Sequence, residues 1–388
     1  MKEIYLDNSA TTAISEAAKA RMREVMEIYG NPSSLHAAGN LAHDMLENAR
    51  RQVTESLGVR RGDGGMTVFT SCGSESDNLA ILGCAYAKPR RKGGKIISTD
   101  SEHAAVENTL RRLEADGFEV ARITTKNGVL NMEQYQKELN NRVFLVTMMM
   151  VNNETGALYD LKKVFSIAKA QNPDIVTHTD AVQGYLKCRF SPKTLGADLV
   201  TVSAHKIHGP KGVGALYLSA DAIRRKDVIP WLLGGGQESG YRSGTENLVG
   251  IAGFGAAAAE GYAALDADVA HMRGLREYAM ERLGALAVRF NLPTGAVAPH
   301  VLNLTLPNVR SETMLHALSH RGICISNGSA CSSHSKNPSS ALLSFGLTEG
   351  ETEASIRVSF SKYNTREDVD ALAEALGEEI ARLVKATR

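Results

Sequence analysis

Lys206 occupies the position in this chain that is most suited to covalent chemistry. It lies in the stretch SAHKIHGPKG, residues 203–212, which follows the β-rich run DLVTVSA. A lysine at the carboxyl end of a strand, with Ser203 and His205 beside it as hydrogen-bond donors, suits an amine that loses its proton and forms a Schiff base. A single loop lysine is more often simply solvated, so the other segments must decide between the two interpretations.

Two further segments contain groups that a flat, phosphorylated cofactor would need. In HTDAVQ, Asp180 ends another strand-like run and could hold a proton on a ring nitrogen, as in pyridoxal phosphate chemistry, while Gln183 could reach a ring oxygen. In FTSCGSESDN, the chain turns through Gly73 into a helix, where backbone N–H groups and the Ser74 hydroxyl could hold a phosphate. Taken alone, these segments also fit a helix-capping aspartate and an ordinary turn.

The remaining candidates would surround such a cofactor and its substrate. His103 follows the run KIIST at the start of a helix, where it could stack on a ring and carry protons near neutral pH. Asn153, in VNNETG, and Arg357, in IRVSF, could together hold a substrate carboxylate. Thr245, in YRSGTEN, could add a phosphate contact to a neighbouring subunit. Each also has an ordinary explanation, such as an exposed histidine, a turn or an ion pair.

The order of these segments along the chain is a stronger observation than any one of them. The phosphate-binding turn, the histidine, the asparagine, the aspartate and the lysine each follow a candidate strand. Parallel strands of an open α/β sheet bring their carboxyl ends to one edge, where such folds build their sites. The order therefore predicts one composite site.

Apolar strand-like runs alternate with helical segments over most of the chain. The candidate strands are MTVFT, KIIST, VFLVTMMM, DIVTHTD, DLVTVSA and VGALYL. This alternation predicts an α/β fold, with a large domain at residues 15–255 that has a mostly parallel sheet flanked by helices. Residues 1–14 and 256–388 are expected to form a smaller α+β domain, with strands HVLNLTL and IRVSFS and a closing helix capped by Thr365.

Composition limits the other functional classes. The 388 residues carry 44 Lys+Arg against 43 Asp+Glu, a net charge of +1 that gives no broad field to attract nucleic acid or an anionic membrane. The run VFLVTMMMV is too short to span a bilayer, and MKEIYLDNSATT has no signal-like core, so a cytosolic protein is expected. Five scattered cysteines without a CxxC pair predict neither a metal site nor a disulfide framework.

Nearly the whole chain resembles the cysteine desulfurases of the NifS/IscS type, which are class V, fold-type I pyridoxal-phosphate enzymes. The resemblance rests on segments that occur in the family's order: YLDNSATT, FTSCGSESDN, EHAAV, NNETG, HTDAVQ, SAHKIHGPKG, RSGTEN and GSACSS. It implies a homodimer that takes sulfur from L-cysteine and passes it to an acceptor protein, such as a scaffold for iron–sulfur cluster assembly.

The resemblance also implies roles for the candidate residues. Lys206 would hold pyridoxal 5'-phosphate, Asp180 would face its ring nitrogen, and His103 would stack on the ring. Asn153 and Arg357 would hold the carboxylate of L-cysteine. The remaining cofactor contacts would come from Gly73, Ser74, Gln183, Ser203, His205 and, from the second subunit, Thr245.

Cys331, in the polar segment SNGSACSSHSKNPSS, takes the position of the family's catalytic cysteine. A thiol that must reach a substrate and then deliver sulfur is poorly served by apolar anchoring, so a polar loop suits it. The resemblance implies attack by this thiolate on the substrate sulfur, with alanine and an enzyme persulfide as products and His103 as the proton carrier. Asn327, His334 and Lys336 depart from the family's usual loop residues, which leaves the sulfur acceptor open.

Two other functions remain open on the sequence alone. A related enzyme on the same scaffold, such as a selenocysteine lyase or another class V aminotransferase-like enzyme, would use most of the same residues. A catalytically idle platform for sulfur relay would not need Lys206, Asp180, His103 and Cys331 together, so their joint presence argues against it. The motifs do not distinguish iron–sulfur assembly, nitrogenase maturation and tRNA thiolation.

Overall fold

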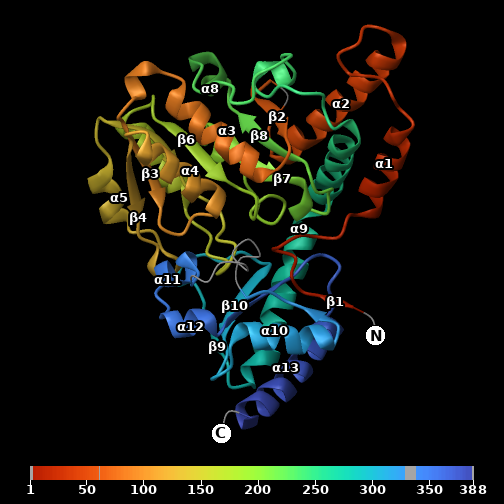
Figure 1. Ribbon diagram of the computed structural model, residues 1–388, viewed down its shortest axis with the longest axis vertical. Helices are drawn as coiled ribbons and strands as arrows, with labels where there is room; N and C mark the ends of the chain where they lie inside the picture. Colours follow the sequence, from red (N-terminus) through yellow and green to blue (C-terminus); the bar gives the residue numbers. More distant parts are fainter. Residues whose placement is uncertain (1–2, 61, 328–337, 387–388) are drawn as a thin grey trace.

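A seven-stranded sheet is the largest layer of the computed structural model, which describes residues 3–60, 62–327 and 338–386 (Figure 1). The strand order is β2-β8-β7-β6-β5-β3-β4. The strands are Met66–Thr70 (β2), Lys95–Thr99 (β3), Glu119–Ile123 (β4), Val143–Thr147 (β5), Val176–Asp180 (β6), Leu199–Ser203 (β7) and Gly214–Leu218 (β8). Within this sheet β8 alone runs in the direction opposite to the other strands, so the mostly parallel sheet expected from the sequence is confirmed.

Helices cover both faces of this sheet, which is why its central strands are apolar along their whole length. The helices of this part are Glu16–Met26 (α1), Ala37–Ser56 (α2), Gly73–Tyr86 (α3), Ala104–Ala115 (α4), Met132–Glu138 (α5), Leu161–Gln171 (α6), Pro192–Leu195 (α7), Ala220–Arg225 (α8) and Leu248–Gly284 (α9). Successive strand residues point to opposite faces. Ile96 accordingly belongs to a core with residues of α3 and α4, whereas Ile97 belongs to a core with residues of α2, α6 and α9.

A second core forms around a three-stranded antiparallel sheet of order β12-β10-β9. The N-terminal segment joins this core, because β1 (Ile4–Tyr5) pairs in parallel with β11 (Ile323–Cys324) and Leu6 is completely buried in it. The other elements are Arg289–Phe290 (β9), Val301–Thr305 (β10), Ser311–His320 (α10), Ser340–Phe345 (α11), Glu349–Glu353 (α12), Ser355–Ser359 (β12) and Arg366–Ala386 (α13).

The 37-residue helix α9 connects the two cores and runs down the centre of the molecule (Figure 1). Phe254, near its start, lies in the core of the large sheet, and Leu275 lies in the second core. By length and composition alone α9 could cross a membrane, but more than half of its most apolar stretch is buried inside the protein, as in a core helix. The domain boundary near residue 255 stays a prediction, because α9 continues through it, and so does the cytosolic location.

Replacing Leu6 by alanine tests whether the N-terminal segment is an integral part of the second core. Leu6→Ala should lower the free energy of unfolding by about 2–5 kcal/mol, because it opens a cavity around a fully buried side chain. The exposed neighbour Glu3 provides the matched control, and Glu3→Ala should change stability by less than about 0.5 kcal/mol. Chemical denaturation measures both variants. Equal stability of Leu6→Ala and wild type would contradict the integral role.

Candidate active site

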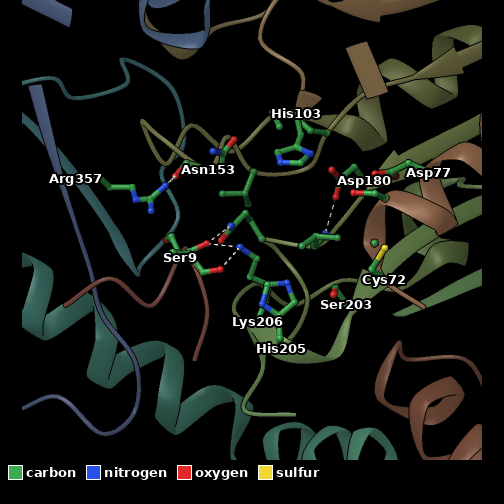
Figure 2. A pocket seen from close by; sticks show the side chains of 17 residues that line it. Ser9, Cys72, Asp77, His103, Asn153, Asp180, Ser203, His205, Lys206 and Arg357 are labelled. Atoms are coloured by element: carbon green, nitrogen blue, oxygen red, sulfur yellow. Dashed lines mark hydrogen bonds between the residues drawn. The ribbon is translucent and has the colours of Figure 1, made fainter. Parts of the chain in front are cut away.

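A cavity of about 160 Å³ opens where the carboxyl ends of β3, β5, β6 and β7 meet (Figure 2). These strands are parallel neighbours, so the residues that follow them converge at one edge of the sheet. Of the predicted site residues, the lining includes Gly73, Ser74, His103, Asn153 and Asp180, together with Gln183, Ser203, His205, Lys206 and Arg357. Thr245 is exposed and does not line this cavity, and Cys331 lies outside the described residues.

Lys206 enters the cavity from the short turn η3 (Ala204–Lys206), which directly follows β7. Its Nζ donates hydrogen bonds to the backbone carbonyls of Ser9, at 2.5 Å, and Ala10, at 2.8 Å. The Nε2 of Gln183 also donates to the Ser9 carbonyl, at 2.9 Å. The segment YLDNSATT therefore forms one wall of the site, a role that its side chains did not reveal in the sequence.

Asp180 ends β6 and lies across the cavity from Arg357 (Figure 2). Its Oδ1 accepts the N–H of Val182 at 2.9 Å. Burial raises the pKa of Asp180, while the positive charges of His103 and Lys206 oppose this rise. Positive charge on Lys206, or on the protonated form of His103, is therefore what favours the carboxylate of Asp180 over the neutral acid.

His103 and Glu102 connect the end of β3 to the start of α4. The His103 Nδ1 accepts the N–H of Ala105 at 3.2 Å, so the proton of the neutral ring lies on Nε2. Glu102 is buried and accepts hydrogen bonds from the Thr99 hydroxyl at 2.6 Å and the Met149 N–H at 3.0 Å. Burial raises the pKa of Glu102 to about 8. Burial thus favours the protonated form of the carboxyl group that directly precedes His103, and sequence reasoning missed this group.

Arg357 reaches the cavity from β12 of the second core with its side chain almost completely buried. Its Nη1 donates to the Asn153 carbonyl and its Nη2 to Asp7 Oδ1, both at 2.8 Å. Its Nε has no hydrogen-bond partner in the described part of the chain. Because a guanidinium has five donor hydrogens in a planar fork, Arg357 keeps the capacity to bind a ligand carboxylate.

The cavity residues fit a phosphorylated pyridine cofactor. The Ser203 Oγ is buried without a hydrogen-bond partner among the described residues, so a donor remains available for a ligand. Gly73 begins α3, and a Cβ at this position would lie only 3.0 Å from Val182 Cγ2, so glycine keeps the helix N-terminus open for a phosphate. Burial, reinforced by nearby lysines, lowers the pKa of His205 to about 3, so His205 offers a neutral imidazole.

The fold and this site define a class-V aminotransferase, since the family described as Aminotransferase class-V matches residues 4–372. The chain is 37% identical to a cysteine desulfurase of Trichormus azollae, over 99% of this chain and 94% of the relative. It is 36% identical to the cysteine desulfurase IscS of Methanosarcina thermophila, over 98% of this chain and 93% of that protein. A solved NifS-like protein superposes with a TM-score of 0.90 at 34% identity, covering 98% of this chain and 100% of the other.

The chain belongs to the cysteine desulfurase family of the NifS/IscS type, whose members use pyridoxal 5'-phosphate. The resemblance seen in the sequence and the expected fold type are confirmed. The roles of the individual residues in the cavity remain proposals.

Replacing Glu102 by glutamine should change how stability depends on pH. Since the folded state raises the pKa of Glu102 from 4.5 to about 8, its contribution to stability is present below pH 4.5 and is lost as pH rises toward 8. The loss approaches about 1.4 kcal/mol per pH unit for one proton. Denaturation curves across this range should be flatter for Glu102→Gln than for wild type. As a control, replacing the exposed Glu349 by glutamine should leave the slope as in wild type. Parallel curves for Glu102→Gln and wild type would refute the raised pKa of Glu102.

Proposed function

We propose that this protein is a pyridoxal-phosphate-dependent cysteine desulfurase that converts L-cysteine into L-alanine and leaves the sulfur as a persulfide on Cys331. One observation carries the proposal: a single cavity joins Lys206, Asp180, His103 and Arg357, and both flanks of the Cys331 segment are attached to its walls. A sulfur-acceptor protein would then receive the sulfur for iron–sulfur cluster assembly or thio-modification.

The cavity offers a binding group for each part of the cofactor. Lys206 is the proposed covalent attachment point, and Asp180 is the proposed anionic partner of the ring nitrogen. Gln183, whose amide is oriented by the Ser9 carbonyl, is the proposed partner of the ring oxygen. When bound, the cofactor supplies an electron sink for the carbon next to the substrate amine. The proposed phosphate contacts within this chain are Gly73, Ser74, Ser203 and His205.

Three groups of this chain would orient L-cysteine and move its protons. Arg357, held in place by Asp7 and the Asn153 carbonyl, is the proposed partner of the substrate carboxylate. The Lys206 amine, once released from the cofactor, is the proposed base for the Cα proton. His103, with its proton on Nε2, is the proposed proton carrier between the thiol groups and the carbon that loses its sulfur.

Cys331 itself is outside the described residues, but both flanks of its segment are described. Ser326 pairs with Arg357 through backbone hydrogen bonds of 3.1 and 2.7 Å. On the other flank, the Ser339 hydroxyl donates to Glu154 Oε2 at 2.7 Å, within the VNNETG segment. Five residues of chain reach at most about 18 Å, so the chain length from Ser326 permits the Cys331 thiol to enter the cavity.

The proposed sulfur transfer balances without an external oxidant or reductant. The Cys331 thiolate forms an S–S bond to the substrate sulfur while the substrate C–S bond breaks. The bonding electrons stay on the carbon, which takes up a proton and leaves as alanine. The sulfur remains on the enzyme as the persulfide, which a thiol of the acceptor protein can then attack.

We further propose a homodimer in which Thr245 contributes to the phosphate site of the second subunit. Residues 229–233 carry apolar side chains on the surface, with Leu233 77% exposed and Trp231 57% exposed. A bridge between Leu232 and Arg242 ties this apolar segment to the loop that carries Thr245. Thr245 does not line the cavity of its own chain, and an exposed apolar segment lies beside its loop. This combination fits an interface between two copies of the chain.

Replacing Cys331 by serine tests the sulfur-transfer step. Cys331→Ser should lower alanine formation from L-cysteine at least about a hundredfold, because the nucleophile is lost, while the absorbance of the bound cofactor stays. Cys324→Ser is the control with a nearby thiol removed and should keep wild-type activity. Mass spectrometry should locate the wild-type persulfide on Cys331. If Cys331→Ser kept most of its turnover, the related class V activities, such as selenocysteine lyase, would gain support instead.

Replacing Leu233 by glutamate tests the homodimer. Leu233→Glu should convert the protein to a monomer and weaken cofactor binding, because a buried charge disrupts the interface and the second subunit's threonine is lost. Sedimentation velocity and cofactor titration measure the two effects. Val129→Glu changes another exposed apolar residue, 45% exposed, and should leave the dimer intact. A dimeric Leu233→Glu protein would place the interface elsewhere.

A further inference from the structure

Asp77 and Asp180 are two carboxyl groups that lie side by side at the inner wall of the cavity (Figure 2). Asp77, on α3, is 1% exposed, and Asp180, at the end of β6, is 7% exposed. Two neighbouring carboxyl groups that are withdrawn from water do not both ionise readily, because each charge raises the cost of the other. We therefore expect the pair to retain one proton at neutral pH.

The surroundings of Asp180 favour its charged form. Lys206 and, in its protonated form, His103 face it with positive charge from the cavity, and the Val182 N–H donates to its Oδ1 at 2.9 Å. All three interactions stabilise a carboxylate relative to a carboxylic acid.

The surroundings of Asp77 favour its neutral form. Besides His178, the titratable groups whose charge acts on Asp77 are Asp180, Glu102 and Cys72, none of which is a cation. His178 Nε2 lies 3.7 Å from Asp77 Oδ1, but burial lowers the pKa of His178 to about 3, so this imidazole is uncharged. Burial and the charge of Asp180 together raise the pKa of Asp77 well above its ordinary value.

The hydrogen bonds around Asp77 agree with this distribution of charge. Its Oδ1 has no hydrogen-bond partner within the described ranges, and an ionised oxygen in that state would be costly. The Thr201 hydroxyl interacts with the Asp77 side chain and lowers its pKa, but by less than burial and the charge of Asp180 raise it. From Thr201 a completely buried chain of polar groups continues to His178 Nε2, at 3.1 Å, and from His178 Nδ1 to the Thr147 hydroxyl, at 2.7 Å. This chain supplies hydrogen bonds but no positive charge.

We propose that Asp77 is a positioning residue that carries the shared proton of the pair and thereby keeps Asp180 ionised beside the ring nitrogen of the cofactor. The inference rests on the role proposed above for Asp180. It assigns a function to a residue that the mechanism otherwise does not use.

Infrared spectroscopy of the holoenzyme tests where the proton lies, because a protonated carboxyl group has a carbonyl band that a carboxylate lacks. Asp77→Asn should remove one such deuterium-sensitive band at neutral pH. Glu102→Gln is the matched control, since burial raises the pKa of Glu102 to about 8 and its substitution should remove a different band. A spectrum of Asp77→Asn that keeps every protonated-carboxyl band of the wild type would overturn the proposal.

A second variant, in which Asp77 itself is unchanged, distinguishes coupling between the two carboxyl groups from a folding defect of Asp77→Asn. In Asp180→Asn, reconstituted with pyridoxal phosphate, the negative neighbour is gone, so the Asp77 band should disappear at a lower pH than in wild type. An unchanged titration would contradict coupling between the two groups. The proposed function can fail separately: if wild type formed no alanine from L-cysteine but the Asp77 band behaved as expected, the inference would stand and the reaction assignment would not.

Discussion

The negative charge proposed for the buried Asp180 is the constraint on which the arrangement of the site depends. A carboxylate that is 7% exposed is costly unless positive charges or hydrogen-bond donors face it. Here Lys206 and, in its protonated form, His103 face it from the cavity. Lys206 follows β7, the parallel neighbour of β6, and His103 follows β3, which lies beyond β5 in the same sheet. The order of the strands therefore determines whether the charge can exist, and the charge in turn determines which ring chemistry the cavity can support.

The cavity also depends on the contact between the two cores. The large sheet supplies the lysine, the aspartate and α3, the helix proposed to bind the phosphate, whereas β12 of the second core supplies Arg357. The N-terminal segment links these parts, because Asp7 contacts Arg357 and the Ser9 carbonyl accepts from Lys206. A shift of one core against the other would therefore separate the proposed cofactor group from the proposed substrate group. The continuous helix α9 opposes such a shift.

Sequence patterns predicted most of this framework, and their failures have physical causes. The predicted strands correspond to β2, β3, β5 to β8, β10 and β12, and the Thr365 hydroxyl accepts the Asp368 N–H at 3.3 Å, which confirms the predicted cap. Strand β4, EVARI, was missed because this edge strand is only partly buried and lacks an apolar run. The carbonyls of Ser9 and Ala10 were missed because backbone atoms have no residue-type signature. Asp77 was missed because its effect depends on a neighbour more than 100 residues away in the chain.

Chemical trapping of the cofactor tests most directly whether Lys206 and Asp180 serve one bound molecule of pyridoxal phosphate. Borohydride reduction of the holoenzyme fixes the cofactor to the amine that holds it, and peptide mapping then identifies that residue. We predict a pyridoxyl group on Lys206 alone. A pyridoxyl group on Lys187 or Lys211 instead would contradict the account of the site.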